Sequence, residues 1–132
     1  MARHIPLNGI AIPAAGTYTS DSFETSDYAY LLAQFKLASP TGGTTIKAYL
    51  QTSVDGEATW IDIICFAFGN SAETKISKVQ ATNALTANTT PSDGALTDDT
   101  VLDGVIGDQC RVKYVVAGTF SAGTITLAVG GK

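Results

Sequence analysis

The sequence predicts an all-β fold, an antiparallel β-sandwich with a jelly-roll-like arrangement of about seven or eight strands. Three observations predict it. Apolar residues recur at every second position in several short segments, glycine, proline, asparagine and aspartate separate these segments, and no stretch of eleven or more residues carries the spacing of an amphipathic helix. The 132 residues fit a single domain with a core of its own.

The first clear strands flank a turn. Apolar and polar residues alternate over 31–37 and again over 46–54, so each strand would bury one face. The segment 39–43 between them holds a proline and two glycines, which predicts that the two strands form a β-hairpin. A weaker strand pattern precedes them over 17–25.

The remaining strands follow a second turn. Asp55-Gly56 is typical of hairpin turns, and Leu50 and Thr52 are expected on the inner face of this hairpin. Residues 60–68 are almost wholly apolar apart from Asp62, which predicts a central strand covered on both faces. Shorter alternating patterns predict three further strands, at 74–81, 110–116 and 124–129.

The segment 1–15 differs from the domain predicted for 16–132. It is apolar and contains Pro6 and Pro13, so we expect an extended arm rather than a strand in a ladder. An apolar arm needs a covering surface; we expect a neighbouring subunit to provide it, the alternative being that the arm folds back onto its own sandwich. The candidate partner contacts are the arm residues and two tyrosines, namely Ile5, Leu7, Ile10, Ile12, Tyr30 and Tyr49.

A long acidic loop is expected over 85–109, because this segment holds five of the nine aspartates and many turn-forming residues. We expect it to be the most exposed or mobile part, except where Val101, Leu102 and Ile106 dock back. The spacing of its aspartates allows calcium binding as the alternative to a solvated loop, with Asp98, Asp99 and Asp103 as the residues in question.

No catalytic constellation is recognisable, so we expect a protein without enzymatic activity, cofactor or metal. His4 is the only histidine, and no nucleophile elbow or phosphate-binding loop is present. Asp62 interrupts an apolar strand and is expected to point outward or to be a buried carboxylate paired with Arg111 or Lys113. Cys65 and Cys110 both lie in strand patterns and are expected to be buried small apolar residues, a disulfide being possible only between adjacent strands.

Charge and hydropathy exclude two classes of partner. The net charge of −4 and the scattered basic residues argue against nucleic-acid binding, because phosphates need basic neutralisation. No apolar run is long enough to span a bilayer, and the first twelve residues lack the apolar core of a signal peptide, so we expect assembly in a reducing cytoplasm.

A resemblance to a known family rests on two stretches. The first reads Leu50-Gln51-Thr52-Ser53-Val54-Asp55-Gly56 followed by Thr59-Trp60-Ile61-Asp62; the second runs from Val101 to Asp108 and continues in Arg111-Val112-Lys113-Tyr114 and Gly118-Thr119. Together they resemble small β-sandwich virion proteins of tailed bacteriophages, found among head and tail structural proteins. The resemblance covers roughly 16–130.

This resemblance implies a non-enzymatic virion component, expected to be a capsid decoration protein that binds the head surface. Its partners would be the major capsid protein or other virion proteins, and further copies of itself in a homo-oligomer; its location would be the virion, after assembly in the host cytoplasm. The rival hypothesis is a glycan-binding or receptor-binding module of a tail or fibre. Sugar rings stack on exposed aromatic side chains, for which Tyr28, Tyr30 and Tyr49 are the candidates.

Overall fold

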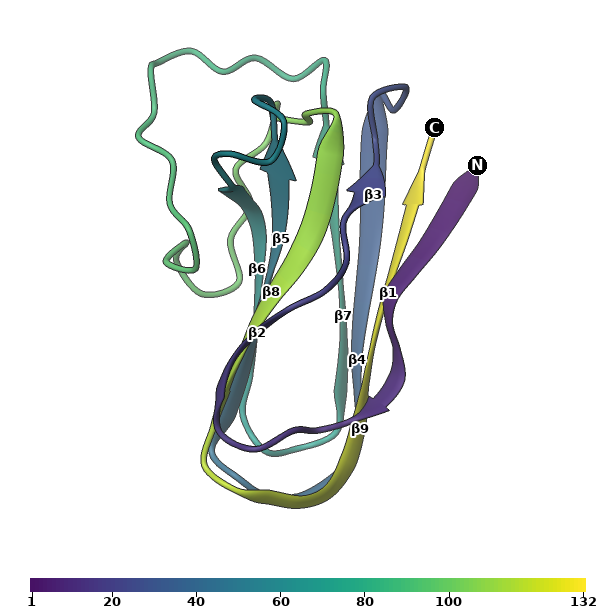
Figure 1. The fold of residues 1–132 in the computed structure, drawn as a ribbon, viewed down its shortest axis with the longest axis vertical. Coiled ribbons are helices and arrows are strands. Elements are labelled where there is room, and N and C mark those ends of the chain that lie inside the picture. Colours follow the sequence, from purple (N-terminus) through teal and green to yellow (C-terminus); the bar gives the residue numbers. More distant parts are fainter.

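The computed structural model describes all residues, 1–132, and contains strands but no helix. Two antiparallel sheets pack face to face, which confirms the predicted β-sandwich (Figure 1). We call the sheet with strand order β1-β9-β4-β7 sheet A and the sheet with order β2-β8-β5-β6 sheet B; β3 also pairs with β8. The strands are β1 (Ala2–Ala11), β2 (Gly16–Thr19), β3 (Phe23–Glu24), β4 (Tyr30–Gly42), β5 (Thr45–Ser53), β6 (Ile61–Phe68), β7 (Glu73–Gln80), β8 (Gln109–Ala117) and β9 (Phe120–Gly131).

The strand order is that of a jelly roll. Strands β2 and β3 lie one after the other along β8, so together they occupy one position and the sandwich has four positions in each sheet. Apart from β2 to β3, the chain passes from one sheet to the other after every strand except β5, which forms a hairpin with β6. This wrapping agrees with the predicted jelly-roll-like architecture.

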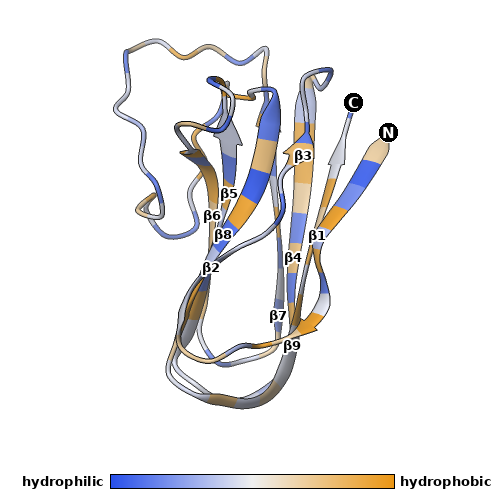
Figure 2. Ribbon diagram, in the orientation of Figure 1, coloured by the Kyte–Doolittle hydropathy of each residue, from blue (hydrophilic) through white to orange (hydrophobic).

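The core lies between the two sheets and is filled by the inward side chains of the strands. Hydrophobic and hydrophilic residues alternate along several of these strands (Figure 2). Strand β4 shows the pattern most clearly, since Leu31, Ala33, Phe35 and Leu37 are buried and the residues between them are exposed. The ring of Phe35 packs against Phe66 and Phe68 of the opposite sheet. The alternation that predicted the strands is therefore also the pattern that closes the sandwich.

The hairpin predicted around 39–43 is wrong. Strand β4 pairs with β7 and β9, whereas β5 pairs with β6 and β8, so the segment carries the chain from sheet A to sheet B. At Gly43 φ is +72°, and a Cβ there would lie 2.2 Å from the ring of Phe120. Glycine is needed at position 43 because the chain passes close to the Phe120 ring as it moves from sheet A to sheet B, and not because it forms a hairpin turn.

The arm predicted for 1–15 is largely a strand. Residues Ala2–Ala11 form β1, which pairs antiparallel with β9, so the expectation that the prolines keep this segment out of a ladder is wrong. Proline is tolerated because β1 is an edge strand, and Pro6 lies at the register shift between His4 and Leu7. The two termini consequently lie side by side at one end of the molecule (Figure 1).

Strand β6 is also placed differently from the prediction. Its residues are buried on both faces, as expected, but β6 lies at the edge of sheet B and not in its centre. The long connection from β7 to β8 runs alongside this edge and supplies the missing cover (Figure 1). No helix is present that could cross a membrane.

Candidate interaction surface

Asp62 fixes the long connection to sheet B. Its carboxylate is fully buried and accepts hydrogen bonds from the backbone N–H groups of Gly94, Ala95 and Leu96 at 2.8–3.1 Å. The Ser92 hydroxyl and the Gln51 side-chain amide donate two more, at 3.0 and 2.8 Å. This donor set satisfies a charged group that would otherwise be costly to bury.

The predicted partners of Asp62 were wrong in detail. Arg111 and Lys113 lie on β8 and form their contacts with Asp93, at 4.0 and 3.0 Å, rather than with Asp62. Arg111 also donates to the side-chain oxygen of Gln51 and stacks over the half-buried ring of Trp60 at 4.4 Å. Gln51 thereby links the two aspartates, because its amide donates to both.

The same connection continues along the free edge of β6. The backbone N–H of Cys65 donates to Thr100, and Leu102 donates to the carbonyl of Ile63. The N–H of Ala67 donates to the carboxylate of Asp99 at 3.0 Å. Leu102 and Ile106 lie against the sandwich as predicted, with Ile106 packed on the core. Val101 forms a backbone bridge with Ile64, but its side chain is 39% exposed.

Three aspartates of the loop form ion pairs within the chain. Asp98 binds Lys47 at 2.9 Å, and Asp99 binds Lys75 at 2.9 Å. The hydrogen bond from Gln51, with further contributions from Lys113 and Arg111, lowers the pKa of the Asp93 carboxyl. Burial acts to raise the pKa of Asp99, but the N–H of Ala67 and the ammonium of Lys75 outweigh it, so this pKa is also lowered.

The calcium alternative has no assembled site. Asp103 accepts hydrogen bonds from the backbone N–H groups of Gln80 and Gly104 and from the Asn83 amide, away from the Lys75 contact of Asp99. No three His, Cys, Asp or Glu side chains come together as a group that could hold a metal ion. Each aspartate in question has its own protein partners instead.

The two cysteines do not pair, and the histidine contacts aromatic rings. Cys65 on β6 and Cys110 on β8 are both buried and unpaired, with β5 lying between their strands. Burial raises the pKa of both thiols, as expected of apolar core positions. The ring of His4 stacks on Phe23 at 4.6 Å, and its Nε2 lies 2.8 Å from the Tyr28 hydroxyl.

The six residues predicted as partner contacts do not form one surface. Leu7 is buried in the core, and Ile10 and Ile12 are partly buried against it. Tyr49 lies under the long connection on sheet B and is 5% exposed, while Tyr30 lies on sheet A beneath the ammonium of Lys78. Ile5 on β1 retains an exposed side chain. Leu7 and Tyr49 are therefore too buried in the single chain to contact a partner, and Ile5 and Tyr30 lie on different strands of sheet A.

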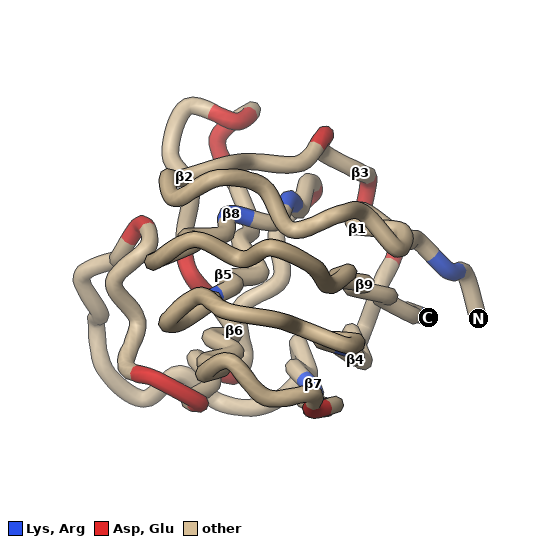
Figure 3. The backbone as a smooth tube through the Cα atoms, turned by 90° about the horizontal axis from the view of Figure 1, so that it is seen from below, with Lys and Arg blue, Asp and Glu red and all other residues tan.

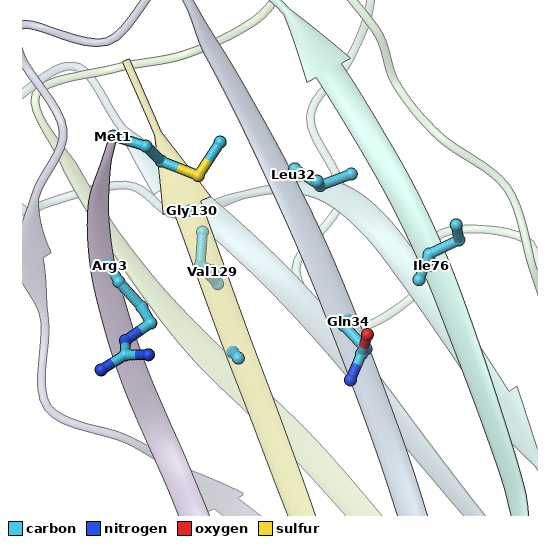
Figure 4. Close-up of a pocket in the computed structure, with 8 residues that line it drawn as sticks. Met1, Arg3, Leu32, Gln34, Ile76, Val129 and Gly130 are labelled. Atoms are coloured by element: carbon cyan, nitrogen blue, oxygen red, sulfur yellow. The ribbon is translucent and has the colours of Figure 1, made fainter.

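A different surface, which we call the outer face of sheet A, is uncovered. Its groove of about 690 Å³ runs across β1, β9, β4 and β7 (Figure 4) and is lined by Met1, Arg3, Leu32, Gln34, Ile76, Ala128, Val129 and Gly130. Leu32 is 40% exposed and Ile76 68% exposed, although both are large apolar side chains. The outer face of sheet B has no such surface, because the long connection buries Tyr49 and Gln51 there.

Charge is distributed unequally over the two outer faces. The basic side chains in ion pairs, Lys47, Lys75, Arg111 and Lys113, all contact aspartates of the long connection or, for Lys75, also Glu73. Arg3, Lys36 and Lys78 lie on the outer face of sheet A and form no ion pair. The exposed outward positions of β4 and β7 carry no acidic residue, and the acidic positions lie mainly in the loops (Figure 3).

The sequence pattern did indicate this exposed apolar face, although the face was not predicted from it. Leu32 and Ile76 are apolar residues on the polar phase of their strands, which marks an outward apolar side chain once the phase is known. Comparisons with protein-family models, with curated proteins and with solved structures found no match.

Proposed function

We propose that the protein is a non-enzymatic structural component of a tailed-bacteriophage virion, a decoration protein that binds the capsid surface. The proposal starts from the resemblance of the hairpin 50–62 and the segment 101–119 to small virion proteins. The observation that carries it furthest is the outer face of sheet A, a cationic surface with exposed apolar side chains. Such faces on stable domains are used for protein–protein contact.

The partner that fits this face is an acidic protein surface. Arg3, Lys36 and Lys78 form no ion pair within the chain, so an acidic partner would supply carboxylates for them. Leu32 and Ile76 would contribute apolar burial at the centre of the contact. Three aspartates of the protein's own acidic loop, Asp93, Asp98 and Asp99, already pair with its own lysines and arginine.

The glycan-binding rival has less support. Stacking on a sugar needs aromatic rings that share one exposed surface, and Tyr30 and Tyr49 lie in different sheets. Tyr28 is engaged by His4 through its hydroxyl. These positions leave the rival without the platform that suggested it.

The proposal is tested by cosedimentation of the purified protein with heads, and separately with tails, of the phage that encodes it. We expect saturable binding to heads, weakened by added salt because part of the attraction is electrostatic. Leu32→Glu should weaken binding at least about tenfold, because it removes apolar contact and places a negative charge against an acidic surface.

Val54→Glu is the matched control, since Val54 is equally apolar, 67% exposed and located in the β5–β6 turn away from sheet A. It should bind like the unmodified protein. Binding to tails alone would move the protein to another part of the virion, and binding to neither particle would contradict the proposed function. Equal binding by both variants would show that the contact lies elsewhere on the molecule.

A further inference from the structure

The edges of the two sheets are protected to very different degrees. Strand β1 has two register shifts and a proline, β2 and β3 are short, and β6 is capped by the long connection. Strand β7 differs from all of these. Its residues Glu73–Gln80 pair with β4 without a register shift, and no strand lies on its other side.

The direction of the free backbone groups follows from two hydrogen bonds. The N–H of Ala81 donates to Ala29, on the β4 side, whereas the N–H of Gln80 donates to Asp103. Because an antiparallel strand bonds alternately to its two sides, Thr74, Ile76 and Lys78 present their N–H and C=O groups at the open edge. Only the end of this edge, at Gln80, is capped by a side chain.

We propose that β7 pairs antiparallel with β7 of a second copy of this chain, about a two-fold axis that passes through Ile76. In this register Ile76 lies opposite its symmetry mate, and Thr74 lies opposite Lys78 in both directions. All three are pairs in which both residues offer their edge groups, so each pair exchanges two hydrogen bonds. The contact is isologous and closes after two subunits.

The side chains favour this register over its neighbours. Moving the axis to Lys75 would place two lysines opposite each other, and moving it to Ser77 would place Ile76 opposite Lys78. With the axis at Ile76, the two Ile76 side chains, each 68% exposed in the single chain, cover one another. The apolar strip that joins Leu32 to Ile76 would then continue across the axis onto the partner copy.

Lysines on an edge strand usually discourage pairing, but both lysines here are engaged within the chain. The ammonium of Lys75 contacts Asp99 and donates to the carbonyl of Ala67. The ammonium of Lys78 lies 5.0 Å from the centre of the Tyr30 ring. Neither charge has to be moved for a second strand to approach. This inference does not depend on the proposed function.

Cysteine cross-linking tests both the contact and its register. Residues in a hydrogen-bonded pair have Cα atoms about 5.5 Å apart, within the range of a disulfide, so Ile76→Cys should cross-link with itself under mild oxidation. Thr74→Cys is the matched control, because its two copies would lie about 13 Å apart along the strands. The unmodified protein provides the background, since Cys65 and Cys110 are buried.

Sedimentation velocity at concentrations up to about 1 mM tests the association without cross-linking. We expect a reversible dimer of the 13.7 kDa chain. Ile76→Lys should weaken it at least tenfold, because it opposes two like charges at the axis. Ile5→Lys on β1, the other edge of sheet A, should leave it unchanged.

A protein that stays monomeric over this range would overturn the proposal. So would a dimer that Ile76→Lys does not weaken, or cross-linking as efficient at residue 74 as at residue 76.

Discussion

Strands β6 and β7 follow one another in the chain and lie on the same side of the sandwich, and each is the edge strand of its sheet. The outer edge of β6 is covered by the chain, whereas that of β7 is not. Along β6, the N–H groups of Asp62, Cys65 and Ala67 all have partners in the long connection. Along β7, the backbone N–H and C=O groups of Thr74, Ile76 and Lys78 face the open edge and have no partner there. One edge is closed by the chain itself, and the other is left for a partner.

The contrast shows what the long connection does. It is longer than a link between two strands needs to be. It is bound to sheet B by the backbone N–H groups of residues 94–96, which donate to Asp62 of β6, and by two of its own aspartates, which pair with Lys47 and Lys113. It therefore covers the edge of sheet B that a further strand would otherwise pair with, and its aspartates neutralise Lys47, Arg111 and Lys113 of that sheet. Sheet A receives no equivalent segment, so its edge, its apolar side chains and its cations remain accessible.

The largest effect is expected from Asp62→Ala. The substitution leaves the N–H groups of Gly94, Ala95 and Leu96 without their acceptor and should lower the free energy of unfolding by about 3–5 kcal/mol. Urea denaturation measures this loss. Hydrogen exchange should show faster exchange in the long connection and at the amides of Cys65 and Ala67, because the β6 edge would lose its cover.

A consequence of this variant sharpens the comparison of the two edges. With its cover loosened, β6 would offer a second unpaired edge, so Asp62→Ala should self-associate beyond a dimer at high concentration. Thr52→Ser would serve as a control that keeps the hydroxyl bonding Gly107 and alters the same hairpin little. Unchanged stability of Asp62→Ala would show that the connection is held by its ion pairs and not by this carboxylate.

The alternating strands could be read from the sequence because period two depends on local pattern alone. The same pattern does not say which strands are neighbours. The two glycines at 42–43 suggested a hairpin between β4 and β5, but the pairing of both strands with residues far along the chain decided the topology. Likewise, proline argued against a strand at the N-terminus, although an edge position next to β9 removes the conflict.

The candidate surface was harder to predict, since it depends on what covers each face. Asp62 was recognised as unusual, and its burial was one of the two expected outcomes, but donors from the backbone of 94–96 leave no trace in residue type. Tyr49 and Ile76 both occupy outward positions. Only the course of the long connection makes the first buried and the second exposed.

A smaller loss of stability is expected from Asp99→Asn, because Asp99 contacts both β6 and β7. Asp99 accepts the Ala67 N–H of β6 and binds Lys75 of β7, and its φ of +56° is one that asparagine tolerates. The change keeps an acceptor for Ala67 but removes the ionic contact, so we expect a loss of about 0.5–1 kcal/mol in urea denaturation, limited by solvent screening. Asp98→Asn should cost less, because its ion pair with Lys47 is more exposed. Equal losses would mean that Asp99 has no special role at the β6 edge.

The smallest effect is a pH dependence confined to the covered edge. The pKa values of Asp93 and Asp99 are lowered below their ordinary 3.8 by hydrogen bonds and basic neighbours. A lowered folded-state pKa stabilises the fold fully above the unfolded-state pKa, and the contribution disappears as the pH falls through the folded-state value. The long connection should therefore cover β6 less firmly below about pH 4. NMR would detect this as faster hydrogen exchange of the Ala67 amide after correction for intrinsic rates.

Amides of β7 that bond to β4 depend on no carboxylate and should keep their protection over the same range. Parallel loss of protection at both strands would indicate global acid unfolding and would remove the distinction between the two edges.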